Sequence, residues 1–219
     1  MKKETFFTTK RALAVDRLTD AILLGRYQPG QSLRQVQLME DLELGATPVR
    51  EAVLDLVARG LLIHESHHGM RVADLNAERV ANTYSVRALL ESEAARLATL
   101  AADDDAIAEV AKHLRAMEQA YERNNLTALG SADSDFHKAL YEAAANPILV
   151  GLVETMWQQF PRYMLWRSEE RIQQSLREHR EILKHFSARD ANAAAEAVRS
   201  HIMNGYAAFE KFLRSVGPN

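Results

Sequence analysis

The chain has 219 residues, of which 47% are apolar and 26% charged, and a formal net charge of −3. This composition is that of an ordinary globular chain, long enough to bury a core in one or two domains. It contains no cysteine, which excludes a disulfide scaffold and any thiolate metal site. No apolar run reaches the roughly 18 residues of a membrane span, and the charged start lacks the apolar region of a secretory signal. We therefore expect a cytoplasmic protein without a membrane partner.

The N-terminal part reads as short elements joined by tight turns, because five of the nine glycines lie in residues 1–75. In chain order it predicts a helix ending at Gly25, a turn at Pro29-Gly30, helices over about 34–42 and 47–60, and short strands at 61–64 and 70–72 around Gly69. Three helices and a two-stranded wing are the plan of a winged helix-turn-helix domain.

Residues 76–219 are rich in Ala, Leu, Glu and Arg and show long helical periodicity. About six helices are expected, opening near Asn76, Asp103, Leu126, Asn146, Ser168 and Asp190. The fourth of them, over about 148–166, contains Pro161, which should kink it. The predicted fold is mainly α: a winged helix-turn-helix domain at 1–74, then an all-α antiparallel helical bundle at 76–219, with the boundary near Asp74–Asn76.

The most specific local pattern is Thr47-Pro48-Val49-Arg50-Glu51-Ala52-Val53, with Gly25-x-x-x-Pro29-Gly30 before it and Gly60-Leu61-Leu62 after it. Over nearly all of residues 10–74 the chain resembles the N-terminal domain of the GntR family of bacterial transcription regulators. The resemblance implies a recognition helix at about 47–59 that enters the major groove of DNA. Thr47 and Arg50 would then reach base edges and phosphates. Without the surrounding motif, Arg50 would be interpreted as a solvated charge on a helix.

The N-terminal domain departs from the family pattern at two pairs of residues. It has Gly45-Ala46 where the family usually has Ser-Arg, and Gln35-Val36 where it has Glu-Arg. Arg34 is expected to substitute for one missing arginine. In the wing, we expect DNA contacts from His68, Gly69 and Arg71, with a merely solvated or weakly metal-binding turn as the alternative. Residues 1–38 contain seven basic and three acidic side chains. We therefore expect the contacts with DNA phosphates to come mainly from this stretch.

In the second half, Asp133 and His137 are four residues apart and share one helix face, while His179 and His201 lie among apolar residues on two further helices. Three histidines facing the core are costly to bury without partners. A metal ion with one Asp and three His ligands would satisfy them, but these residues alone favour the alternative of core histidines that are satisfied without a metal.

Arg87-x-x-Leu90-Glu91, Asp133-x-x-x-His137 and Asn146-Pro147 resemble the FCD ligand-binding domain of the FadR-type subfamily. The resemblance implies that Asp133, His137, His179 and His201 bind one divalent ion, with zinc favoured and nickel, manganese or iron as alternatives. It also places Arg87 and Asn146 at an effector pocket. Arg87 can instead form a surface salt bridge with Glu91, and Asn146 is also a helix cap.

We therefore expect a homodimeric transcription regulator, not an enzyme, which binds a palindromic double-stranded DNA operator. A small carboxylate bound at the metal site would modulate this binding. The alternatives are a metal-dependent hydrolase that uses the Asp–His site, a metal sensor without an organic effector, and a helical interaction protein with a structural ion. The hydrolase is less favoured because no general base is evident beside the ligands.

Overall fold

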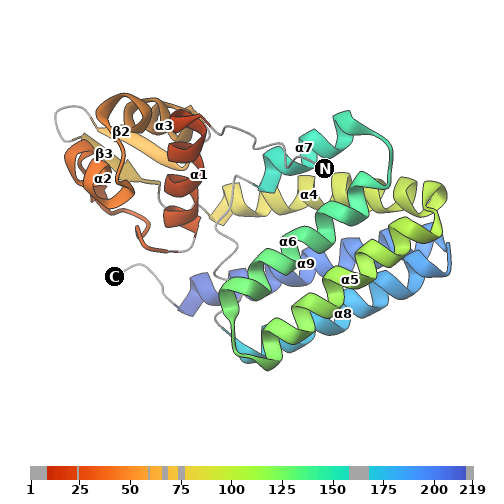
Figure 1. The fold of residues 1–219 in the computed structure, drawn as a ribbon. Helices are drawn as coiled ribbons and strands as arrows, with labels where there is room; N and C mark the ends of the chain where they lie inside the picture. Colours follow the sequence, from red (N-terminus) through yellow and green to blue (C-terminus); the bar gives the residue numbers. More distant parts are fainter. Residues whose placement is uncertain are drawn as a thin grey trace. The chain divides into compact units, whose positions relative to one another are not determined.

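Nine helices and three strands make up the part of the chain that the structure, a computed structural model, describes (Figure 1). This part consists of residues 9–23, 25–58, 60–65, 69–73, 77–157 and 168–215. The chain divides into two units, and the second begins at Ala77. The predicted boundary near Asp74–Asn76 lies outside the described residues. Each unit is described by itself.

The first unit contains α1 (Lys10–Leu23), β1 (Ser32–Leu33), α2 (Gln35–Leu42), α3 (Ala46–Ala58), β2 (Leu62–Glu65) and β3 (Gly69–Val72). The strands form one antiparallel sheet in the order β1-β3-β2, with Ser32 opposite Arg71 and Leu62 opposite Val72. The winged helix-turn-helix fold is thus confirmed. Strand β1 was not predicted, because two residues are too few to show an alternating pattern.

Apolar side chains from all three helices close the core of this unit. Leu18, Leu38 and Leu56 are completely buried between α1, α2 and α3. Gly25 follows α1 with a φ of 74°, the left-handed conformation expected of a residue that ends a helix. A polar contact adds to the apolar packing, since Arg17 of α1 donates from its Nη1 atom to the main-chain oxygen of Leu42, at the end of α2, over 2.7 Å.

The second unit consists of α4 (Ala77–Ala101), α5 (Asp104–Glu122), α6 (Leu126–Glu142), α7 (Pro147–Trp157), α8 (Glu169–Ser187) and α9 (Ala191–Ser215). The predicted all-α bundle is confirmed. Asp103 and Asn146 cap α5 and α7, as expected: their side chains accept hydrogen bonds from the main-chain nitrogens of Ala106 and Leu149. The predicted cap at Asn76 and the kink at Pro161 lie outside the described residues.

Three helices of the bundle carry the candidate ligands. Helix α6 packs against α5 and α4, α8 packs against α5 and α9, and α9 lies along α4 (Figure 1). The apolar faces of α6, α8 and α9 therefore all contribute to one interior, in which Phe136, Ile182 and Val198 are completely buried. Among the helices described, none is both long and apolar enough to span a membrane.

Candidate functional site

Four predicted ligands lie together in the interior of the helical unit. Asp133 and His137 come from one face of α6, His179 from α8 and His201 from α9. All four side chains are buried, His179 completely. The ligand atoms of the three histidines lie within 4.8 Å of one another. Three helices thus bring together side chains that are far apart in the sequence.

The shortest distances in this cluster join atoms that can bind a metal ion. The Nε2 atom of His179 lies 3.1 Å from Nε2 of His137 and 3.2 Å from Oδ1 of Asp133. His137 Nε2 lies 4.0 Å from the same Asp133 oxygen. Tetrahedral zinc with bonds of about 2.0 Å keeps its ligand atoms about 3.3 Å apart. The spacing is therefore compatible with one first-row divalent ion bound by all three residues.

One ring nitrogen of His179 is hydrogen-bonded within its own helix. Its Nδ1 atom lies 2.7 Å from the main-chain oxygen of Ser175, one turn earlier in α8. A carbonyl oxygen only accepts hydrogen bonds, so Nδ1–H donates. The opposite ring nitrogen, Nε2, lies beside His137 and Asp133.

A chain of buried polar groups leads from Arg87 to Nδ1 of His137. Arg87 donates from Nε to Glu91 at 2.7 Å, and the Tyr141 hydroxyl lies 2.9 Å from the other Glu91 oxygen and 3.2 Å from His137 Nδ1. Burial alone would lower the pKa of Arg87, but the charge and hydrogen bond of Glu91 outweigh burial and raise this pKa. The Glu91 carboxylate accepts a hydrogen bond from the Tyr141 hydroxyl. The hydroxyl oxygen can in turn accept from Nδ1–H of His137, and in that tautomer Nε2 of His137 can bind a metal ion.

The Nε2 atoms of His137 and His179 thus lie 3.1 Å apart, and His179 Nε2 lies 3.2 Å from the buried carboxylate of Asp133. Imidazole nitrogens and a carboxylate oxygen are ligands that divalent transition metals accept. The cluster is therefore a candidate cation site.

The third imidazole, His201, is oriented by a carboxylate. Its Nδ1 atom lies 2.7 Å from Oε2 of Glu178, which also accepts from Nη1 of Arg171 at 2.9 Å. Burial lowers the pKa of His201 to about 4 in spite of Glu178, so the ring is neutral at pH 7 and donates from Nδ1. Burial favours a higher pKa for Glu178, but His201 and Arg171 outweigh it and lower this pKa to about 2.

Sequence reasoning missed the groups that orient the three imidazoles. These are Ser175, Tyr141 and Glu178, together with Arg171 behind Glu178. Two of them carry a local signal, because Ser175 and Tyr141 each lie four residues from the histidine that they contact. The contact of Glu178 with His201 joins two helices and has no such signal.

The two predicted effector residues occupy different places. Arg87 is buried, so its interpretation as a surface salt bridge is wrong, although the partner Glu91 is the expected one. The guanidinium carbon of Arg87 also lies 5.0 Å from the centre of the Tyr84 ring. Asn146 caps α7, and no contact among the described residues joins it to the histidine cluster.

The predicted DNA-binding residues lie on the helices and wing of the first unit. A groove of about 690 Å³ brings together Arg34 at the start of α2, Arg50 of α3 and Gly69 of β3, with His64 beside them. Thr47 is exposed in the first turn of α3, and Arg71 is half-buried on β3. His68 lies outside the described residues.

Gly69 has a conformation and a neighbour that favour glycine. Its φ is 91°, and a Cβ atom there would lie 3.1 Å from the main-chain oxygen of Leu33 in β1. Any other residue would therefore strain the junction of β1 and β3. The close approach explains why the wing has glycine at this position, independently of any contact with DNA.

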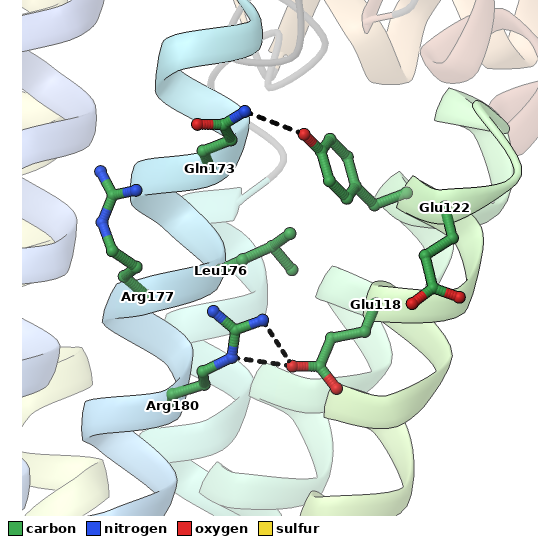
Figure 2. Close-up of a pocket in the computed structure, with 7 residues that line it drawn as sticks. Glu118, Glu122, Gln173, Leu176, Arg177 and Arg180 are labelled. Carbon is green, nitrogen blue, oxygen red and sulfur yellow. Dashed lines mark hydrogen bonds and ion pairs between the residues drawn. The ribbon is translucent and has the colours of Figure 1, made fainter.

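A second groove, of about 520 Å³, lies between α5 and α8 (Figure 2). Arg180 of α8 donates from Nε to Glu118 of α5 at 2.8 Å, and Gln173 donates to the Tyr121 hydroxyl at 3.0 Å. These contacts across the groove hold α8, the helix that carries His179, against α5.

A winged helix-turn-helix unit followed by an all-helical unit is the architecture of a two-domain transcription regulator. Residues 10–72 match the family of bacterial regulatory proteins called gntR, and residues 82–204 match the FCD domain. The chain therefore belongs to the GntR family and carries an FCD domain, as its sequence motifs indicated.

Individual relatives agree with this assignment. The chain is 28% identical over 189 residues to the HTH-type transcriptional regulator YdhC of Bacillus subtilis, covering 85% of this chain and 84% of YdhC. It is 28% identical over 196 residues to the HTH-type transcriptional repressor GlaR of Escherichia coli, and the match covers 85% of this chain and 89% of GlaR. The structure of E. coli McbR/YncC superposes on this chain with a TM-score of 0.82 and 21% sequence identity. The superposition covers 94% of this chain and 99% of that one, and it supports the fold.

Proposed function

We propose that this regulator binds a palindromic operator as a homodimer, and that a small carboxylate bound at a metal ion in its helical unit changes its operator affinity. The metal is supported mainly by one observation: the Nε2 atoms of His137 and His179 lie 3.1 Å apart beside the buried carboxylate of Asp133, with His201 close to both. Effector binding alters operator affinity because it favours one arrangement of the DNA-binding units over another.

The ligand set favours one divalent transition-metal ion per chain. Imidazole nitrogens and one carboxylate oxygen suit zinc, nickel, manganese or iron, and we propose zinc as the principal ion. Asp133 and His137 would bind it from α6, His179 from α8 and His201 from α9. An ion that accepts five or six ligands keeps positions for water or an effector carboxylate.

Arg87 is the proposed anchor for that carboxylate. It is buried, and its Nε atom donates to Glu91. Glu91 and Tyr141 connect it to His137 through a path of three hydrogen bonds. A guanidinium close to a metal site can hold an anion with both charge and geometry.

The proposed homodimer is supported by apolar side chains on two neighbouring helices. Helix α4 exposes Val86 and Leu89, and α7, which packs against α4, exposes Ile148 and Leu152. Large apolar side chains gathered on one surface are typical of protein interfaces. A second copy of the chain would cover them and would place two identical winged helices for the two halves of a palindrome.

Ile148→Arg is expected to convert the dimer into a monomer. Ile148 is 78% exposed, so the substitution leaves the core intact while it places a charge in the proposed interface. Multi-angle light scattering of the wild type and the variant measures the change in mass. As a control, Leu126→Arg alters an exposed leucine on α6 and should leave the mass unchanged. A wild type that is monomeric at micromolar concentration would refute the dimer.

Arg50→Ala is expected to weaken specific operator binding by about 1–3 kcal/mol, the usual value of a bidentate contact with guanine. Gel shifts on a palindrome selected from random DNA measure the effect. Arg115→Ala removes another exposed arginine, from α5, and serves as the control. Unchanged affinity of a folded Arg50→Ala protein would exclude Arg50 as a DNA contact.

The combined proposal is tested by operator binding of the metal-loaded and metal-free protein, each with a panel of small carboxylic acids. A carboxylate that changes operator affinity only in the loaded protein is the expected result, and it should also raise the melting temperature. Release of the operator by metal alone would instead indicate a metal sensor. Turnover of simple esters or phosphates would indicate a hydrolase.

A further inference from the structure

Glu178 of α8 accepts hydrogen bonds from three donors beside the candidate metal site. Its Oε2 atom lies 2.7 Å from Nδ1 of His201 and 2.9 Å from Nη1 of Arg171, and its Oε1 atom lies 2.8 Å from Nδ2 of Asn204. Arg171 and Asn204 can only donate through these nitrogens. They therefore hold the carboxylate in place as the acceptor for His201, across the boundary between α8 and α9.

The three imidazoles of the cluster differ in the acceptor that their Nδ1 atoms contact. His179 has a main-chain oxygen, His137 has the Tyr141 hydroxyl, and His201 has the Glu178 carboxylate. A hydrogen bond to an ionised acceptor is shorter and stronger than one to a neutral acceptor. It also makes the opposite ring nitrogen a better metal ligand.

We propose that Glu178 is a positioning residue for the metal ion. It keeps His201 protonated at Nδ1, leaves Nε2 free for the ion, and holds the orientation of the ring. This inference rests on the metal site of the proposed function. Loss of such an outer partner typically weakens metal binding 10–100-fold.

Glu178→Gln tests this role with little change in size. The uncharged amide cannot accept from all three donors, because its nitrogen only donates, so the hydrogen bond that orients His201 is weakened or lost. Zinc affinity of the metal-stripped full chain, measured by competition with a chromophoric chelator, should fall about 10–100-fold. Glu181→Gln on the same helix removes an exposed carboxylate that pairs with Lys184, and should leave zinc affinity within about twofold.

A double-substitution cycle separates positioning from a general effect of charge or stability. If Glu178 acts through His201, Glu178→Gln should have little further effect on zinc affinity in a His201→Ala background. Additive losses in the double variant would overturn the positioning role. Thermal unfolding of the metal-free proteins shows whether each variant is folded.

The outcomes distinguish this inference from the proposed function. A wild type that binds no zinc removes the metal site and the inference together. A wild type that binds zinc, with equal affinity in folded Glu178→Gln protein, overturns the inference alone. If Glu178→Gln does not fold, Asn204→Ala removes a donor to Glu178 from an exposed position and should weaken zinc binding roughly fivefold. Wild-type affinity in that variant would likewise overturn the inference.

Discussion

His179→Ala is expected to abolish stoichiometric metal binding and to lower the melting temperature of protein incubated with zinc. His179 is completely buried, and its Nε2 atom is the one that lies closest to both His137 and Asp133. An ion bound only by the native state stabilises it by about 4 kcal/mol when its concentration is a thousand times the dissociation constant. Losing the central ligand removes this contribution.

The measurement is elemental analysis of protein purified without a histidine tag, combined with thermal unfolding. His185→Ala provides a matched control, since His185 lies on the same helix but contacts Glu181 at the surface. A wild type without metal after incubation with zinc, nickel and manganese would make the cluster a polar core group. Full occupancy in His201→Ala protein would show that the metal shell is smaller than proposed.

Arg87→Met is expected to abolish the response to carboxylates and also to destabilise the metal-free protein. Glu91 is completely buried, and the substitution leaves it without its cation. Breaking a buried ion pair in this way costs about 3–5 kcal/mol. Because Glu91 also contacts Tyr141, beside His137, we expect some loss of metal affinity as well.

Chemical denaturation and the carboxylate panel distinguish these effects. Arg87→Met combined with Glu91→Gln removes the unpaired charge, so it should recover part of the stability without restoring the carboxylate response. Arg96→Met breaks an exposed pair with Glu93 on the same helix and should change neither quantity appreciably. A full carboxylate response in Arg87→Met protein would place the ligand elsewhere.

Local sequence signals predicted the fold well because they arise within single elements. Asp103 and Asn146 were recognised as caps from their own positions, and both make the expected hydrogen bonds. His179 and His201 were assigned to the interior from the apolar residues of their own helices, and both are buried. Strand β1 was missed because its pairing with β3 depends on residues almost forty positions further along the chain.

The contacts that determine the chemistry of the cluster were less accessible to sequence reasoning. The Tyr141 hydroxyl bonds to Glu91 of another helix, and Glu178 bonds to His201 across two helices. Such pairs depend on how helices pack, which periodicity within one helix does not determine. The burial of Arg87 is a further example, since an Arg and a Glu four residues apart are typical of a helix surface.

The contact between Arg17 and Leu42 affects how the binding of DNA depends on salt. Each phosphate neutralised by a cationic side chain releases counterions and contributes about −0.9 to the slope of log affinity against log salt concentration. Arg17 donates to a main-chain oxygen at the end of α2, and Arg11 lies 3.9 Å from Asp55 of α3. The short contact thus engages Arg17 within the protein itself, whereas Arg11 remains largely exposed. We therefore expect operator binding to depend less on salt than the seven basic residues of the first 38 positions would suggest.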